Sequence, residues 1–451
     1  TGQFRRDGNS TLGQEKFGNF WSVGGSWNVK NESFAPSLFS TLNLRASYGV
    51  LGNIPYADQW GNQYNANALV NYDSNIGYGG YSGYGYILSP GNPDLQWEEA
   101  KHLDIGADIG FFNDRLKFTL DYYNKITDKA IFFARPALES GGPDSYYDNV
   151  ATIGNEGFEL VIDATPIQTD NFKWSINANG AYSKTMLDKF NFPLYQFNPA
   201  DPEAGAGDAD NELVALSQGH IFGEYYVVLY AGVAQQDDPS KGIKAGDPLF
   251  YTDGSKTDVT NQRTEADPAW MGKSAFPVYN VGLTNEFKYK NISLSFMLSG
   301  QFDFYVQNGV HSYTLHDGRF PVRNQINDAL YDSWTDAPGA ENYNASNPRA
   351  TVGDPLTGRL ESSRFLNKGD HIRLKEMRLA YSFGNLFKES TGINNLTVYL
   401  RGTNLLTYVF DKDLDYDPES NSNAWSWVGK GRYWYASPVL RTVSMGIQVG
   451  F

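Results

Sequence analysis

The sequence predicts an all-β chain that forms part of a transmembrane antiparallel β-barrel. Three observations predict this fold. Apolar and polar residues alternate in many segments, tight turns and long loops alternate between those segments, and no stretch stays apolar for the roughly 18 residues that a membrane-spanning helix needs. The 451 residues include 46 Gly, 30 Tyr, 28 Phe and 10 Trp, a composition that favours strands and aromatic surfaces over helix bundles.

The alternation is clearest at the end of the chain, where one face is apolar and the other is polar or glycine: Val443, Met445, Ile447, Val449 and Phe451 against Thr442, Ser444, Gly446, Gln448 and Gly450. Side chains of a strand point to opposite faces in turn, so this segment predicts a strand with one buried or lipid-covered face. The same pattern predicts strands within 42–48, 103–111, 116–122, 158–164, 172–178, 281–289, 292–298, 377–383 and 396–400. With weaker segments included, the template gives about 13 strands.

The connections between these strands are of two kinds. Asn113-Asp114, 169–171 and Lys290-Asn291 have the composition of tight turns, whereas the links near 52–96, 190–218, 306–368 and 410–436 are long. An outer-membrane barrel has short turns at one end and long external loops at the other, which a soluble sandwich has no reason to share. Aromatic residues next to the tight turns suit an interfacial girdle, with ordinary sandwich core as the alternative: Phe111, Phe112, Phe172, Trp174, Phe287, Tyr289 and Phe383.

Several function classes are disfavoured. The net charge of -15 opposes nucleic-acid binding, and the absence of Cys removes thiolate sites. The five His show no paired metal spacing, and no nucleophile-elbow or phosphate-loop pattern occurs. The acidic segment 253–258 lacks the ligand spacing of an EF-hand. We therefore expect no enzyme activity, no catalytic residue, no metal and no cofactor.

The candidate binding residues are aromatic and lie in two of the long loops. Flat amphipathic rings there can stack on sugar faces or pack against peptide side chains, and the alternative is that they pack the loops on one another. The candidate substrate-binding residues are Trp60, Tyr78, Tyr81, Tyr84, Tyr86, Trp425, Trp427, Tyr433 and Trp434. The acidic stretches 201–212 and 411–419 are expected at the rim of the barrel, where charge tunes encounter.

Ordered motifs along the chain resemble signatures of the SusC/RagA family of outer-membrane transporters. They comprise Arg6 to Ser10, Leu44 to Gly49 with Gly52-Asn53, Asn92 to Glu98, Asp121 to Lys125, Asn155 to Leu160, Phe287 to Asn291, Ile372 to Lys375, Gly402 to Thr407 and Asp417-Pro418-Glu419. His371 stands where the family more often has an aromatic residue, a difference expected to affect only local packing.

This resemblance implies a multi-pass β-barrel in the outer membrane of a Gram-negative cell. About 22 strands close a barrel of this class, so residues 1–451 are expected to be its C-terminal part, with the plug and the N-terminal strands on another segment. The family resemblance also implies active import of an oligomeric nutrient, a SusD-like surface lipoprotein as partner, and coupling to the TonB system through the missing N-terminal part. An oligosaccharide is favoured as substrate and an oligopeptide is the alternative.

Two other functions stay open at the level of sequence. The barrel could have a structural or assembly-scaffold role at the outer membrane, in which the long loops hold other surface proteins. The chain could also be a soluble extracellular binding sandwich, which the alternation of loop lengths opposes.

Overall fold

A computed structural model describes all residues except 55–68, 79–80, 90, 135–145, 197–212, 316–317, 319–323, 328–331, 336–346, 354–355, 357–361, 385–391, 423–429 and 451. The chain divides into two compact units. Unit 1 contains Thr1–Pro193, Ser217–Phe222 and Val281–Ser293, and unit 2 contains Leu194–Leu216, Gly223–Asn280 and Leu294–Phe451.

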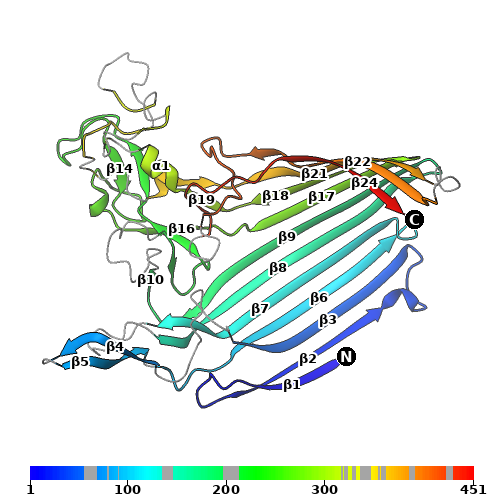
Figure 1. The fold of residues 1–451 in the computed structure, drawn as a ribbon, viewed down its shortest axis with the longest axis horizontal. Helices are drawn as coiled ribbons and strands as arrows, with labels where there is room; N and C mark the ends of the chain where they lie inside the picture. Colours follow the sequence, from blue (N-terminus) through cyan, green and yellow to red (C-terminus); the bar gives the residue numbers. More distant parts are fainter. Residues whose placement is uncertain are drawn as a thin grey trace. The chain divides into compact units, whose positions relative to one another are not determined.

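Unit 1 is built from long antiparallel strands that pair in chain order (Figure 1). They are β1 (Gly2–Gly8), β2 (Phe17–Asn28), β3 (Phe39–Asn53), β6 (Glu98–Phe111), β7 (Leu116–Ala134), β8 (Tyr146–Gln168), β9 (Phe172–Phe190) and β17 (Tyr279–Tyr289). A short 3-10 helix, Val29–Asn31, follows β2. A separate hairpin, β4 (Leu69–Tyr78) and β5 (Tyr81–Ser89), is inserted between β3 and β6.

The tight turns of unit 1 lie together at one end of its strands. Phe112, Asn113 and Asp114 adopt positive φ between β6 and β7, as does Lys290 after β17. The backbone N–H of Lys290 donates to the carbonyl of Asn171 at 2.8 Å, and that of Thr165 donates to Arg115 at 2.7 Å. These contacts join neighbouring turns, which is the grouping that the sequence predicts.

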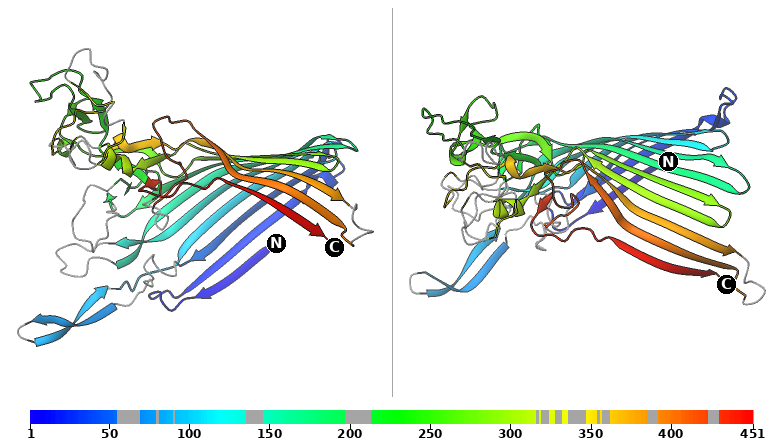
Figure 2. Two further views of the ribbon diagram at one scale, coloured as in Figure 1. Left: turned by 45° about the horizontal axis from the view of Figure 1, so that its top comes forward. Right: turned by 90° about the horizontal axis from the view of Figure 1, so that it is seen from above.

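Unit 2 combines long strands with a set of short ones. The long strands are β18 (Ile292–Phe302), whose first residues belong to unit 1, β21 (His371–Gly384), β22 (Asn395–Val409) and β24 (Thr442–Gly450), and the last three pair in that order. Figure 2 shows the antiparallel course of β21, β22 and β24 from two further directions. The full order of long strands is β1-β2-β3-β6-β7-β8-β9-β17-β18-β21-β22-β24, a sheet of 12.

The short elements of unit 2 form four small sheets. They pair as β10 (Tyr195–Gln196) with β11 (Ala215–Leu216), β12 (Glu224–Val227) with β16 (Ala269–Ser274), β13 (Tyr230–Val233) with β14 (Pro248–Tyr251) and β15 (Val259–Thr260), and β20 (Leu366–Lys368) with β19 (Tyr305–Asn308) and β23 (Arg432–Tyr433). One helix, α1 (Gly309–Thr314), and the 3-10 helices Arg263–Glu265 and Ser363–Phe365 complete the set.

The long strands have one apolar and one polar face. Ile105 of β6 is 48% exposed and pairs with Ala46 of β3 and Tyr122 of β7 on the same face. On the other face Arg45 donates to Asp108 at 2.6 Å and to Asp121 at 2.5 Å. Exposed apolar side chains on one face and half-buried ion pairs on the other are what a lipid-facing surface and a polar lumen require.

The structure confirms the predicted all-β fold and each strand that the alternation predicted. A girdle also forms beside the tight turns, where Trp174 stacks on Phe287 with ring centroids 5.7 Å apart. The sequence did not predict β1 and β2, or the folding of 213–275 into small sheets.

Candidate site at the loop end of unit 2

The aromatic residues predicted to bind substrate fall into three groups. Trp60, Trp425 and Trp427 fall outside the described residues, as does the acidic stretch 201–212. The four tyrosines of the 52–96 loop lie on one hairpin, where Tyr78 pairs with Tyr81, and Tyr84 and Tyr86 pair with Asp73 and Asn71. The structure therefore brings these four positions onto two adjacent strands.

Tyr433 and Trp434 pack within unit 2. Tyr433, at the end of β23, stacks on Tyr416 with centroids 4.1 Å apart and planes within 11°. Arg432 lies over the Trp434 ring at 5.1 Å, and a Cβ on Gly309 would overlap that ring. By contrast Tyr435, the next residue, is 69% exposed. The first two rings thus join β23 to α1 and to the loop after β22, whereas the Tyr435 ring is exposed.

Residues 213–216 and 223–275 of unit 2 fold around an apolar core, to which Leu366 also contributes, and they form a platform rather than an irregular loop. Tyr225 of β12 is buried in it, and its hydroxyl donates to the carbonyl of Tyr305 in β19 at 3.2 Å. The core comprises Leu213, Val214, Tyr225, Val227, Leu229, Ala269, Ala275 and Leu366. Apolar burial of this kind gives the loop end of unit 2 a defined shape on which binding side chains can be placed.

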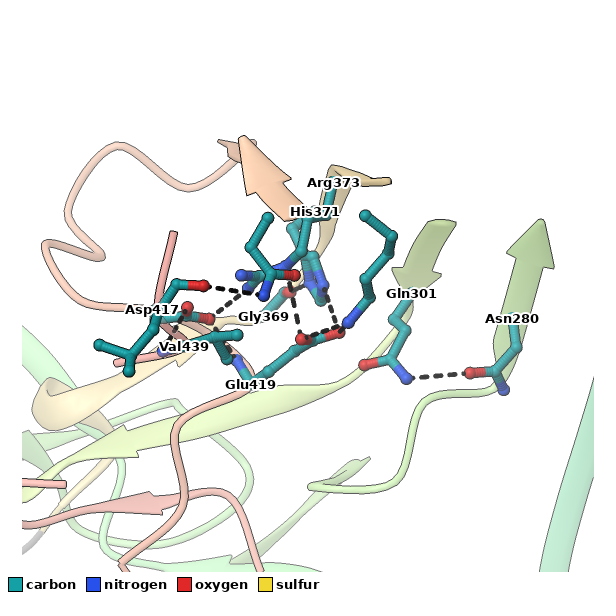
Figure 3. A network of polar contacts seen from close by, with 11 residues as sticks. Asn280, Gln301, Gly369, His371, Arg373, Asp417, Glu419 and Val439 are labelled. Atoms are coloured by element: carbon teal, nitrogen blue, oxygen red, sulfur yellow. Dashed lines mark hydrogen bonds and ion pairs between the residues drawn. The ribbon is translucent and has the colours of Figure 1, made fainter. Parts of the chain in front are cut away.

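The segment after β22 is fastened to β21 by a cluster of charged residues (Figure 3). We call residues 411–422 the inner loop. Arg373 of β21 is 1% exposed and donates to Asp417, and its Nε lies 3.4 Å from Glu419 Oε2. Lys375 Nζ donates to the two oxygens of Glu419 at 2.8 and 2.7 Å. The cationic side chains of Arg373 and Lys375 thus contact the carboxylates of Asp417 and Glu419.

His371 of β21 also belongs to the cluster. Its side chain is fully buried, its Nδ1 lies 2.8 Å from the carbonyl of Gly369, and its Nε2 lies 3.5 Å from Glu419 Oε1. The difference from the family pattern at this position therefore affects more than local packing, because the imidazole faces a carboxylate of the inner loop.

The electrostatics of the cluster favour charged carboxylates. Burial alone would raise the pKa of Glu419, but hydrogen bonds from His371 and Lys375 and the charge of Arg373 outweigh it and lower the pKa to about 2. A buried carboxylate keeps its charge only with such partners. Removal of one partner from a buried pair costs about 3–5 kcal/mol because it leaves the other charge uncompensated.

The inner loop is also attached at other points along its length. The carboxylate of Asp411 accepts the backbone N–H of Lys368 at 2.9 Å, and Asp415 Oδ2 lies 3.1 Å from His311 Nε2. Asp415 has a lowered pKa, chiefly through this contact with His311. Between them Leu414 is buried against Phe304 and Val306. The inner loop is therefore held by charge pairs and by the apolar packing of Leu414 and Tyr416.

The position of Arg373 shows which face of β21 the inner loop covers. Ile372, its neighbour, is exposed on the apolar face and pairs with exposed Tyr408 of β22. Successive side chains of a strand point to opposite faces, so Arg373 lies on the polar face. The acidic stretch 411–419, predicted to tune encounter at the rim, thus uses Asp417 and Glu419 to bind the polar face of β21.

A second anchored point lies in unit 1, at the base of the β4–β5 hairpin. The amide of Asn92 donates to Asp148 Oδ1 at 2.8 Å, and its Oδ1 accepts the N–H of Asp94 at 3.0 Å, which forms an Asx turn at Asn92-Pro93-Asp94. Leu95, with no exposed surface, packs with Leu12 and Ile131. Two of the signature motifs, around Ser10 and Asn92, meet here.

The described part of the chain contains neither a cluster of metal-ligand side chains nor a membrane-spanning helix. Among the residues that the structure describes, no three His, Asp or Glu side chains gather as metal ligands. In the acidic segment 253–258, the carboxylate of Asp253 accepts a hydrogen bond from the backbone N–H of Ser255, and the carboxylate of Asp258 accepts one from Lys241. None of the described helices is long and apolar enough to cross a membrane.

Comparisons with known proteins bear on the fold and on the relatives of the chain. A family model described as TonB dependent receptor-like, beta-barrel matches residues 1–296. TonB-dependent receptor P26 of Formosa agariphila is 28% identical over 458 residues, which cover 99% of this chain and 44% of the relative. TonB-dependent receptor SusC of Bacteroides thetaiotaomicron is 24% identical over 400 residues, 86% of this chain and 36% of the relative.

A solved structure shows the same fold over the whole length of this chain. The RagAB peptide importer in its open-open state is 25% identical with a TM-score of 0.79, and the match covers 100% of this chain and 45% of that one. The chain thus spans less than half the length of the relatives that it matches.

Proposed function

Because this chain belongs to the TonB dependent receptor-like β-barrel family, we propose that it is part of an active importer of an oligomeric nutrient. Its relatives include SusC and the RagAB importer, as the sequence motifs predicted, and it is an outer-membrane β-barrel protein. These relatives are transporters or receptors rather than enzymes. The observations that carry the proposal are strands with one apolar and one charged face in unit 1, and a folded loop platform in unit 2.

The barrel needs strands besides those described here. In the described part of the chain, β1 and β24 end the strand order, and an open sheet edge in lipid leaves backbone groups without hydrogen bonds. We therefore propose that residues 1–451 supply the C-terminal part of the wall, and that a further segment brings the remaining strands, the plug and the contact with the TonB system.

We propose a SusD-like surface lipoprotein as the partner at the loop end. Support comes from the size of the folded platform and from rings such as Tyr435, which would otherwise expose apolar surface to water. The tyrosine positions of the β4–β5 hairpin offer a second contact surface. Such a lid would enclose substrate between itself and the barrel.

The proposed substrate is an oligosaccharide, with an oligopeptide as the second possibility. Of the nine aromatic residues named from the sequence, Tyr433 and Trp434 pack within unit 2; the other seven would stack on sugar faces, and the tyrosine hydroxyls and nearby carboxylates would accept or donate hydrogen bonds. The oligopeptide alternative is supported by the shared fold with RagAB, which is a peptide importer.

The test has a biochemical part and a growth part. Gentle detergent purification of the full-length receptor at low salt should recover a second protein in equal amount, with cross-links in the long loops. Cells should lose growth on one polymer class when Tyr78, Tyr81 and Trp434 are changed to Ala. Tyr289→Ala beside a tight turn is the matched control and should leave growth unchanged. Recovery of the barrel alone, with growth unaffected by the loop variants, would favour the scaffold role instead.

A further inference from the structure

The inner loop lies on the side of β21 along which solutes would pass. Arg373 is on the polar face of that strand, opposite exposed Ile372, and Asp417 and Glu419 of the inner loop bind it there. In outer-membrane barrels the polar face of each strand points into the lumen. The inner loop is therefore laid against the inner, polar side of the wall at the loop end of β21.

We propose that the inner loop narrows the entrance to the lumen beside β21, and that Arg373 is the positioning residue that keeps it there. The part of this proposal that concerns solute size rests on the proposed transport function, whereas the placement of the loop does not. A layer of chain packed on a sheet is about 10 Å thick. Release of the inner loop would widen the entrance on that side by about this distance.

The chemistry of the contact explains why an arginine holds the inner loop. The guanidinium group presents several N–H donors in one plane, so it can bind Asp417 through Nη2 while its Nε faces Glu419 at 3.4 Å. Lys375, two residues along, binds only Glu419. A lysine at position 373 would keep the charge but not the fork, and would hold one carboxylate instead of two.

The other attachments determine what release would look like. Leu414 is buried with Phe304 and Val306, and Asp415 faces His311. These contacts precede Asp417, and after Glu419 the loop is held again at Ser422 by hydrogen bonds with the backbone of Arg432 and Trp434, so loss of Arg373 should loosen the stretch from Asp417 to Ser420 and leave both ends of the inner loop in place. A variant at Arg373 is thus expected to change access to the lumen without unfolding the platform.

Single cysteine reporters can measure this access because the chain contains no Cys. Ser444 on β24 pairs with Arg401 of β22, on the polar face, and Met445 pairs with Leu400 on the apolar face. In the full-length receptor in intact cells, Ser444→Cys reports the lumen and Met445→Cys is the matched reporter on the lipid side. The probes are maleimides carrying polyethylene glycol chains of increasing length, added from outside, and the receptor without a reporter gives the background.

The expected result is a shift in the size limit. With Arg373 present, only short reagents should label Ser444→Cys. Arg373→Gln and Asp417→Asn should each admit longer reagents and expose the inner loop to added protease, while Met445→Cys stays unlabelled. Arg373→Lys should give an intermediate limit, because a lysine keeps the charge but holds one carboxylate instead of two. A role confined to folding would not grade the size limit in this order.

Other outcomes would overturn the proposal. Equal size limits in Arg373→Gln, Asp417→Asn and the unmodified receptor would show that the inner loop does not narrow the entrance. If Arg373→Gln fails to reach the membrane, Asp417→Asn alone decides, because it removes one charge and keeps the shape of the side chain. Transport is not needed for this readout. A shifted size limit without any nutrient uptake would refute the proposed function and leave the placement of the inner loop standing.

Discussion

Ile105→Arg tests the assignment of faces in unit 1, on which the orientation of the lumen depends. The outer face of β6 changes from apolar to charged at Lys101, which binds Asp128 at 2.5 Å, and it ends in the aromatic Phe111. With a rise of about 3.3 Å per residue and a strand tilt of about 40°, the ten residues between them span roughly 25 Å across the bilayer. This matches the height of the apolar band of such barrels.

The same geometry gives the depth of Ile105. It is six residues from Phe111, which places it about 15 Å above the end of the band and within about 3 Å of the midplane. An arginine on the lipid face at that depth costs about 2–4 kcal/mol. Ile447→Arg on β24, where the side chain is 63% exposed on the apolar face, should also be costly.

The assay is urea unfolding of the full-length receptor in lipid vesicles. The folded fraction is measured at each urea concentration by the heat-dependent shift in gel mobility. The matched control is Gln448→Arg, because Gln448 follows Ile447 on the same strand and pairs with Thr397 on the polar face. It should cost less than about 0.5 kcal/mol, as surface substitutions do. A shift of one residue in register exchanges the two faces of a strand. Equal costs for Ile447→Arg and Gln448→Arg would therefore refute the face assignment.

Two further predictions concern the anchored points. Leu95→Ala should destabilise unit 1 by about 2–5 kcal/mol, since Leu95 has no exposed surface; exposed Asp94→Ala is its control in the same unfolding assay, and equal effects would contradict the core at this position. The pKa of Glu419 is about 2 in the folded chain against 4.5 as its ordinary value, so its carboxylate stabilises the inner loop above about pH 4.5 and this contribution is lost as the pH falls toward 2. Protease cleavage of the inner loop should rise over that pH range and should depend less on pH in Glu419→Gln, where the contact between Asp415 and His311 still titrates; an unchanged profile in the variant would count against the cluster.

The strands that the sequence predicted are those with an apolar outer face, which is the face turned to the bilayer. The alternation around 116–122 indicated a strand there, but β7 continues to Ala134. Beyond the apolar band the outer face carries Lys101 and Asp128, and hydrophobic alternation no longer distinguishes the two faces. Periodicity reports a difference in solvent between two faces, so it cannot follow a strand that has water on both sides.

The strand β2 escaped prediction for a different reason. Phe20 lies on the polar face of that strand and is buried, because Gly18 and Gly52 leave the space that its ring occupies. An aromatic residue on the polar face breaks the alternation, and only the three-dimensional neighbours explain why it is tolerated. The fold class could thus be predicted from the sequence, whereas strand ends and the interior of the loop end required the structure.

The contact between Arg373 and Asp417 could not be predicted, because 44 residues separate them and nothing local couples them. The physical need for a charged contact can still be derived. A loop that lies against the polar face of a barrel strand meets few apolar side chains, so hydrophobic burial cannot hold it along its whole length. Carboxylates opposite Arg373 and Lys375 are groups that can bind such a face. The acidic composition around Asp417 and Glu419 then follows from where the inner loop lies, and these two carboxylates are poorly placed to attract a partner from solution because their charges are already paired.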